Sequence, residues 1–255
     1  MTVPVEMYAL TCGEITISYP SLRSTETGML RVPVTSYLIV HPHGQVLFDS
    51  GMSPQIYDNY DDYVPEYAKK DRQFHFGPGE DVAARLQKAG FDPTAVDLVV
   101  NSHLHHDHCG GNSLLPNADI LVQGRELDHA RKQPDDTMAY RKADFETGQH
   151  LRTLDGEHDI FGDGALVCVP TNGHTPGHQS LRVSTEAGTW FLCGDACYLT
   201  ASLDDLVLPL NVTDSASTLT VLENLQAMRN NGVHVLVGHD PEFWKTVPQA
   251  PDRIA

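Results

Sequence analysis

Residues 102–111 read SHLHHDHCGG and place four histidines and one aspartate among the six positions from 103 to 108. The run follows VDLVV at 96–100, whose composition predicts a strand. Imidazole nitrogens and carboxylate oxygens suit Zn²⁺, Fe²⁺, Mn²⁺ and Co²⁺, and a loop at a strand end can turn several of them toward one point. The HxHxDH spacing therefore predicts a metal site rather than a polar loop with scattered histidines.

Three further donors lie in the second half of the chain. His174 lies in GHTPGH, Asp195 in CGDA and His239 in VGHD, and each follows a β-rich run or a loop beside one. One cluster of donors cannot complete the coordination of two ions, so donors at other strand ends are required. These three residues are candidates for a site assembled along one edge of a sheet.

Two stretches of similar design predict hairpins. Residues 32–51 and 178–196 each contain two β-rich runs joined by a turn, and each stretch carries an aspartate near its end, Asp49 and Asp195. The repetition predicts a pseudo-duplicated fold with two packed sheets.

Helices are expected between and after these hairpins. Apolar residues at helical spacing predict helices at 80–93 and 217–231, the second stopped by Gly232. Strands at 96–100 and 233–238 follow the two helices. Helices that alternate with strands and hairpins predict the α/β (α+β) class, with two mixed sheets flanked by helices.

Length and composition narrow the class of protein. The 255 residues contain no linker-like segment, which predicts a single domain over 1–255. Five cysteines with no CxxC pair predict no disulfide framework. No apolar run approaches the ~20 residues of a membrane span and no basic leader precedes an apolar stretch, so a cytoplasmic protein without a membrane partner is expected.

The charge excludes one class of partner. The chain carries 34 acidic and 17 basic residues, a formal net charge of −17, and lacks a Lys/Arg cluster. Such a surface would repel a phosphate backbone, so a nucleic-acid partner is not expected.

The type, order and approximate spacing of the donors resemble the seven ligands of the metallo-β-lactamase superfamily. The resemblance runs from the Asp49 hairpin to VGHD and implies an αββα sandwich with a dinuclear metal site. Two divalent ions are implied, with Zn²⁺ the first expectation and Fe, Mn or Co as alternatives. The resemblance implies one ion on His103, His105 and His174, a second on Asp107, His108 and His239, and Asp195 as the bridge.

Other residues near the motif are not assigned as ligands. His106 and His178 are expected to be structural or to support the ligands, and Cys109 is not needed because the ligand set is complete without it. Asp49 is expected to orient a histidine from outside the coordination shell.

Within the superfamily, the chain resembles the N-acyl homoserine lactonases. This resemblance rests on the stretches SHLHHDHCGGN, GHTPGHQS and VGHDP and on Tyr198, which lies three positions after Asp195 in DACY. The resemblance implies hydrolysis of a small neutral lactone with an acyl tail by a metal-bridging hydroxide. Tyr198 would stabilise the oxyanion rather than bind metal, and Asp107 would help the ring oxygen leave.

Alternatives remain open. A hydrolase of another lactone, of the γ-butyrolactone or 4-pyridoxolactone type, or a glyoxalase II-like thioesterase would use the same ligands, and a di-metal binding scaffold would not be an enzyme. A zinc β-lactamase is disfavoured because its commonest type has a cysteine where this chain has Asp195.

The aromatic segment 52–79 is expected to cover the pocket or to form a homodimer contact, since its tyrosines and phenylalanines would be costly as free surface. Met29, Leu30, Phe74 and Phe76 are candidates for the pocket lining, because they lie in irregular segments.

Overall fold

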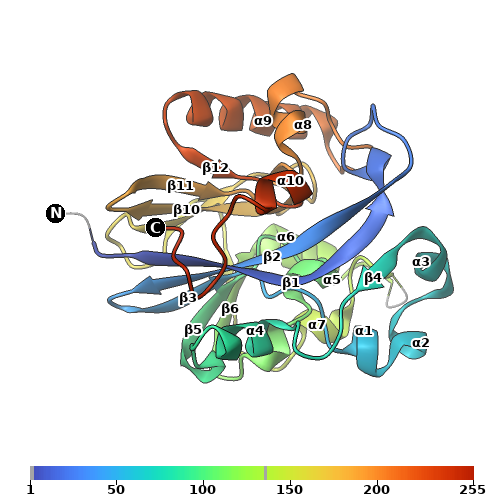
Figure 1. The fold of residues 1–255 in the computed structure, drawn as a ribbon, viewed down its shortest axis with the longest axis horizontal. Helices are drawn as coiled ribbons and strands as arrows, with labels where there is room; N and C mark the ends of the chain where they lie inside the picture. Colours follow the sequence, from blue (N-terminus) through green and yellow to red (C-terminus); the bar gives the residue numbers. More distant parts are fainter. Residues whose placement is uncertain (1–2, 135–136) are drawn as a thin grey trace.

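The computed structural model describes residues 3–134 and 137–255. Over these residues two β-sheets pack face to face, and helices cover the outer face of each sheet (Figure 1). This arrangement confirms the predicted αββα sandwich with two mixed sheets.

The first sheet has seven strands in the order β4-β1-β2-β3-β5-β6-β7. The predicted hairpin at 32–51 is confirmed as the antiparallel pair β2 and β3, with Tyr37 opposite Phe48. Strands β3, β5, β6 and β7 run parallel, which makes the sheet mixed. The strands are β1 (Glu6–Ser18), β2 (Met29–His41), β3 (Gly44–Phe48), β4 (Gln73–His75), β5 (Val96–Val100), β6 (Asp119–Gln123) and β7 (Leu151–Leu154).

The second sheet has five strands in the order β12-β11-β10-β9-β8. The hairpin predicted at 178–196 is confirmed as β10 and β11. The strand predicted at 233–238 is shorter in the structure, because the N–H groups of Gly238 and His239 donate to the carbonyls of Cys197 and Tyr198 instead of to a strand. The strands are β8 (His158–Asp159), β9 (Leu166–Pro170), β10 (Gln179–Thr185), β11 (Gly188–Leu192) and β12 (His234–Leu236).

Both faces of the first sheet are buried. Successive strand residues point to opposite faces. Phe48 and Val100 therefore lie in the core between the sheets, whereas Leu47 and Val99 pack toward Leu86 of the outer helix layer. A strand buried on both faces reads as a continuous apolar run, as VDLVV nearly does.

The two predicted helices are confirmed, with shifted ends. Helix α4 (Val82–Lys88) begins at Asp81, whose carboxylate accepts from the N–H of Ala84. Helix α9 (Ser215–Asn230) begins two residues earlier than predicted, because Asp214 caps its first turn. It packs Leu222 and Leu225 on the outer face of the second sheet.

The remaining helices are short. Three of them belong to the aromatic segment 52–79 and attach it to the body of the protein. The Tyr63 hydroxyl donates to Asp144 Oδ2 at 2.5 Å, and the Tyr67 hydroxyl accepts from the N–H of Met138 at 2.6 Å. The short α-helices are α1 (Gln55–Asp58), α2 (Tyr60–Tyr63), α3 (Glu66–Asp71), α5 (His106–Cys109), α6 (Gly124–Ala130), α7 (Lys142–Phe145), α8 (Thr200–Asp205) and α10 (Pro241–Trp244).

Candidate metal centre

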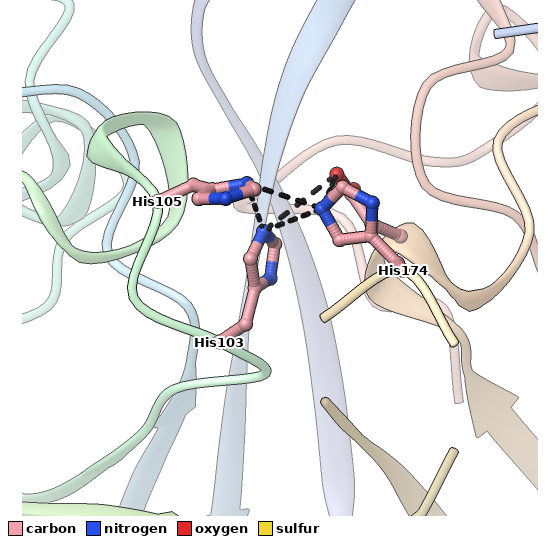
Figure 2. A group of neighbouring side chains, drawn as sticks. His103, His105 and His174 are labelled. Atoms are coloured by element: carbon pink, nitrogen blue, oxygen red, sulfur yellow. Dashed lines mark hydrogen bonds and ion pairs between the residues drawn. The ribbon is translucent and has the colours of Figure 1, made fainter. Parts of the chain in front are cut away.

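Three histidines from two distant segments point at one another. His103 and His105 follow β5, and His174 lies between β9 and β10 (Figure 2). His103 Nε2 lies 2.9 Å from His105 Nδ1 and 3.2 Å from His174 Nε2. His174 Nε2 lies 3.1 Å from His105 Nδ1. Three ring nitrogens thus converge on a single point.

A second group of donors lies beside the first. Asp107, His108 and His239 offer ligand atoms within 4.8 Å of one another, and so do the three histidines together with Asp195. The structure therefore brings all seven candidate residues together, in the two groups that the resemblance implied.

The Asp195 carboxylate lies between the two groups. Its Oδ1 atom is 3.2 Å from His108 Nε2 and 3.0 Å from His239 Nε2. Its Oδ2 atom is 3.3 Å from His174 Nε2 and 3.7 Å from His103 Nε2. One oxygen faces each group, which suits a carboxylate shared by two ions.

The outer hydrogen bonds of His108 and His239 determine which nitrogen faces inward as an acceptor. His108 Nδ1 lies 2.8 Å from Asp49 Oδ2, and His239 Nδ1 lies 2.7 Å from the carbonyl of Pro33. Both partners only accept, so each Nδ1 carries the proton and the lone pair of a neutral ring is on Nε2. These lone pairs face Asp195 Oδ1, itself an acceptor. His108 Nε2 and Asp195 Oδ1 are buried without a hydrogen-bond partner, and a cation between them would satisfy both.

Asp49 also orients His103, through a serine. The Ser102 hydroxyl donates to Asp49 Oδ2 at 2.8 Å, so its oxygen accepts from His103 Nδ1 at 2.9 Å and leaves the Nε2 lone pair facing inward. The expectation that Asp49 orients a histidine from outside thus agrees with its contacts. Ser102 had no role in the sequence-based prediction, although it precedes the motif directly.

The glycines of the motif permit a close approach. A Cβ atom on Gly111 would lie 2.2 Å from the carbonyl oxygen of Ser50, and one on Gly110 would lie 2.4 Å from the nitrogen of Ser53. The chain after β3 therefore packs directly against the end of α5. This contact places Asp49 next to the histidine loop.

Glu126 is a functional candidate that sequence reasoning missed. Its side chain is fully buried. It accepts from the N–H of Leu104 at 3.1 Å, from the N–H of Gly177 at 3.2 Å and from the Tyr140 hydroxyl at 3.1 Å. A Cβ on Gly177 would lie 2.2 Å from the nitrogen of Glu126, so glycine is needed there. One carboxylate thus joins the loop of His103 and His105 to the loop of His174.

The three residues that were not assigned as ligands lie outside the donor groups. His178 Nε2 accepts from the N–H of Asp195 at 3.0 Å. His106 Nε2 accepts from Arg72 Nη1 at 3.2 Å. Cys109 is buried in an apolar cluster, and burial raises the pKa of its thiol well above the usual range. His178 therefore fixes the backbone of Asp195, and Cys109 packs against apolar side chains.

The two groups differ in their affinity for protons. Burial and the neighbouring histidines hold the pKa values of His103 and His105 well below the usual range. Burial also opposes the charged forms of His108 and His239, but the nearby carboxylates, Asp195 foremost, together outweigh it, so the pKa of His108 lies well above its usual range and that of His239 is raised. Burial opposes the charged form of Asp195 too, yet the surrounding histidines hold its pKa well below the usual range.

A cavity of about 850 Å³ opens onto both groups. Tyr198 lines it, and its hydroxyl lies 2.8 Å from His174 Nδ1. Met29 lines the cavity as predicted. The prediction was wrong for three residues. Leu30 packs in the cluster that contains Tyr198, Phe74 lies 5.7 Å from the His106 ring, and Phe76 lies 5.3 Å from the Tyr57 ring.

An αββα sandwich whose strand-end loops carry two groups of histidine and aspartate donors defines a class of metal-binding proteins. The metallo-beta-lactamase superfamily matches residues 29–239, and the chain belongs to that superfamily. The resemblance drawn from the motifs is thereby confirmed.

Two curated relatives are named N-acyl homoserine lactonases. An N-acyl homoserine lactonase, AttM, of Azorhizobium caulinodans is 30% identical over 269 residues, which cover 97% of this chain and 97% of the relative. An N-acyl homoserine lactonase of Bacillus cereus is 29% identical over 259 residues, which cover 100% of both chains.

Two solved structures of N-acyl homoserine lactone hydrolases are also similar to this chain. An N-acyl homoserine lactone hydrolase, with the product N-hexanoyl-L-homoserine bound at its catalytic metal centre, matches with a TM-score of 0.88 and 26% identity over 100% of both chains. A quorum-quenching N-acyl homoserine lactone hydrolase matches with a TM-score of 0.84 and 27% identity, over 100% of this chain and 99% of the other.

Replacing Glu126 by Gln should weaken metal binding about tenfold, a loss typical of residues that orient ligands. The amide keeps the size of the side chain but turns one acceptor into a donor, so either Leu104 or Gly177 loses its acceptor. A chelator competition measures the change. Glu223→Gln, on the exposed side of α9, is the control. Unchanged metal affinity in a folded Glu126→Gln variant would contradict this role.

Metal binding to Asp107, His108 and His239 should strengthen as pH rises, more than binding to the three-histidine group. A raised pKa keeps the His108 and His239 rings protonated to higher pH, and each displaced proton weakens binding about tenfold per pH unit below that pKa. Calorimetric titrations between about pH 6 and pH 8, in buffers of different ionisation enthalpy, count the protons released. Equal proton release by the two binding events would refute the assignment.

Proposed function

We propose that this protein hydrolyses the lactone ring of N-acyl homoserine lactones with two divalent ions. The observation that carries the proposal is the position of Asp195, with one oxygen toward each donor group, at a cavity that Tyr198 also lines. Similarity over nearly the full length to N-acyl homoserine lactonases supports the substrate class.

The donor sets suit the ions. His103, His105 and His174 would hold one ion, Asp107, His108 and His239 the other, and Asp195 both. Nitrogen and carboxylate donors fit Zn²⁺, which we propose first, and also accept Fe, Mn or Co. When bound, two such ions supply a Lewis acid for the lactone carbonyl and an activated water as nucleophile.

Tyr198 is proposed to stabilise the oxyanion. His174 Nδ1 carries its proton toward the tyrosine oxygen when Nε2 faces the donor group, so the phenol proton is free to be donated. Burial raises the pKa of Tyr198 well above the usual range, which keeps that proton in place at neutral pH. A donor held beside the cavity can stabilise charge that develops on the carbonyl oxygen.

Asp107 is proposed to move a proton to the leaving oxygen. Burial disfavours its charged form, but His106, His108 and His239 hold the pKa of Asp107 below the usual range. Its carboxylate is therefore ionised and can accept a proton from the attacking water and return it to the ring oxygen, which leaves as an alcohol. The side chain is 19% exposed and lines the cavity, so it is accessible to substrate.

The surroundings of the site favour a neutral substrate with an apolar tail. Apolar side chains line part of the cavity, and the formal charge of −17 opposes nucleic acid. Within residues 3–134 and 137–255, none of the helices combines the length and apolarity that crossing a bilayer requires. We propose that the protein is cytoplasmic and that residues 1–255 form one domain. We also propose that the exposed side chains of Tyr60 and Tyr67 form a homodimer contact.

One observation favours a second candidate. Although the sequence lacks a Lys/Arg cluster, Lys70 and Arg72 both line the cavity, and a thioester of glutathione carries carboxylates that such residues bind. A glyoxalase II-like thioesterase therefore remains the alternative, together with hydrolysis of another lactone. A panel of acyl homoserine lactones, other lactones, a glutathione thioester and a β-lactam, read with a pH indicator, tests all of these. Metal binding without acid release would instead favour a scaffold.

His105→Ala and His239→Ala should each lower the metal content from about two ions per chain and remove most activity. Each variant removes one donor from a different group. Elemental analysis of the purified protein gives the ion count. His43→Ala, in an exposed turn, is the control. Full metal content and full rate in either variant would show that the ligand assignment is wrong.

Tyr198→Phe should lower kcat/KM about 10- to 100-fold on homoserine lactones, because the ions share the oxyanion charge with the lost hydroxyl. The same hydroxyl contacts His174, so metal affinity should fall by no more than about tenfold. Kinetics at saturating metal separate the two effects. Tyr57→Phe, outside the cavity lining and the proposed dimer contact, is the control. An unchanged kcat/KM would remove Tyr198 from the mechanism.

A further inference from the structure

A chain of hydrogen bonds begins at the backbone of Asp195 and runs behind the metal centre. His178 Nε2 accepts from the N–H of Asp195 at 3.0 Å, and His178 Nδ1 lies 2.8 Å from Thr171 Oγ1. Thr171 Oγ1 lies 2.8 Å from Ser180 Oγ, which donates to the carbonyl of Cys193 at 3.0 Å. Cys193 is two residues before Asp195, so the chain closes on the turn that carries the shared carboxylate.

The two ends of this chain fix the direction of every proton in it. A backbone N–H only donates, so His178 Nε2 carries the lone pair of a neutral ring and Nδ1 donates its proton to Thr171. A carbonyl only accepts, so Ser180 donates to Cys193 and accepts from Thr171. Thr171 must therefore accept from the imidazole and donate to the serine at the same time, which its hydroxyl group allows.

The chain is shielded from water. His178 and Ser180 are fully buried, and Thr171 is 6% exposed. A buried polar group that loses its partner finds no replacement in solvent, which makes the loss of one member costly. Gly194 permits the close packing, because a Cβ atom there would lie 3.0 Å from His178 Nε2.

The same chain holds two metal ligands against each other. Thr171 follows β9, His178 precedes β10, and the N–H of Thr171 donates to the carbonyl of His178 at 2.9 Å. These residues close the loop 171–178, which carries His174. Asp195 Oδ2 lies 3.3 Å from His174 Nε2. Thr171 thus lies at the base of the His174 loop and, through the imidazole, fixes the turn of Asp195 beside that loop.

We infer that Thr171 is a positioning residue for the carboxylate of Asp195, and that it acts through His178 to keep one Asp195 oxygen toward each donor group. The inference rests on the proposed function for the role of Asp195 between two ions. Without the Thr171 hydroxyl, the proton on His178 Nδ1 has no acceptor, and the ring loses the contact that sets its tautomer and orientation. Ligands whose outer hydrogen bonds are removed bind metal less tightly.

The test compares Thr171→Val, which removes the hydroxyl and keeps the branched shape, with Thr171→Ser, which keeps the hydroxyl. Chelator competition gives the Zn²⁺ affinity, and electron paramagnetic resonance of the Mn²⁺-loaded protein shows whether the two ions are coupled through a shared ligand. Thr171→Val should bind Zn²⁺ about tenfold more weakly and show an added signal from uncoupled Mn²⁺. Thr171→Ser should restore both properties.

Thr185→Val is the matched control. Thr185 is also buried, and its hydroxyl donates to the Gly188 carbonyl at 3.2 Å, at the opposite end of β10 from Ser180. This variant should unfold at a lower temperature and keep the wild-type Zn²⁺ affinity and Mn²⁺ coupling. If Thr171→Val does not fold, Ser180→Ala takes its place, because it removes the acceptor of the Thr171 proton and should also weaken Zn²⁺ binding.

Wild-type affinity and coupling in Thr171→Val, or in Ser180→Ala when that variant replaces it, would overturn the inference. So would an equal loss of Zn²⁺ affinity in Thr185→Val at the same loss of thermal stability, because Thr171 would then act through stability alone. None of these measurements uses a lactone. A wild type that binds two coupled ions and opens no lactone ring overturns the proposed substrate alone, whereas uncoupled ions in the wild type overturn the bridging role of Asp195 and the inference with it.

Discussion

The structure depends on a set of hydrogen-bond acceptors that face one another around Asp195. The Nε2 lone pairs of His108 and His239 point at Asp195 Oδ1 from 3.2 and 3.0 Å, because Asp49 and the Pro33 carbonyl take the protons on their other nitrogens. While both rings are neutral, these buried acceptors face one another without a donor, which is unfavourable, and the carboxylates around them therefore raise the pKa values of both rings. A divalent cation held by these residues would satisfy the same acceptors without a proton on either ring.

Asp49 is the residue through which the sheet imposes this geometry. Its backbone is held by β5 and β2, since its N–H donates to the Val100 carbonyl at 3.0 Å and its carbonyl accepts from Ser36 Oγ at 2.7 Å. Its φ of 58° is unusual for a residue other than glycine. Strain of this kind persists where the surroundings enforce it. Here it directs one carboxylate to Ser102 and His108 at once.

Four of the donors were predictable from their local spacing and the other three from their resemblance in order to the superfamily's ligands, whereas the residues that support them were not predictable. HxHxDH lies in one loop, and the strands that carry it show as apolar runs. Glu126 lies in an ordinary helical sequence, GRELDHA, and acquires its role only when the loops of Leu104 and Gly177 meet it in space. The prediction of the residues that line the pocket failed because it also depends on how the chain is arranged in space. Met29 and Leu30 are adjacent in β2, so their side chains point to opposite faces.

The same constraint couples the ions to the fold. Without a cation, the loops after β5, β9, β11 and β12 bring acceptors together in a buried region, where only protons on rings such as His108 and His239 can offset their repulsion. The unfolded chain has no preformed site, so binding at the native site contributes directly to the free energy of folding. Glu126 and Asp49, fixed by backbone contacts, hold the loops in place against that repulsion. The residues that orient the ligands therefore also stabilise the packing of the loops at this edge of the sandwich.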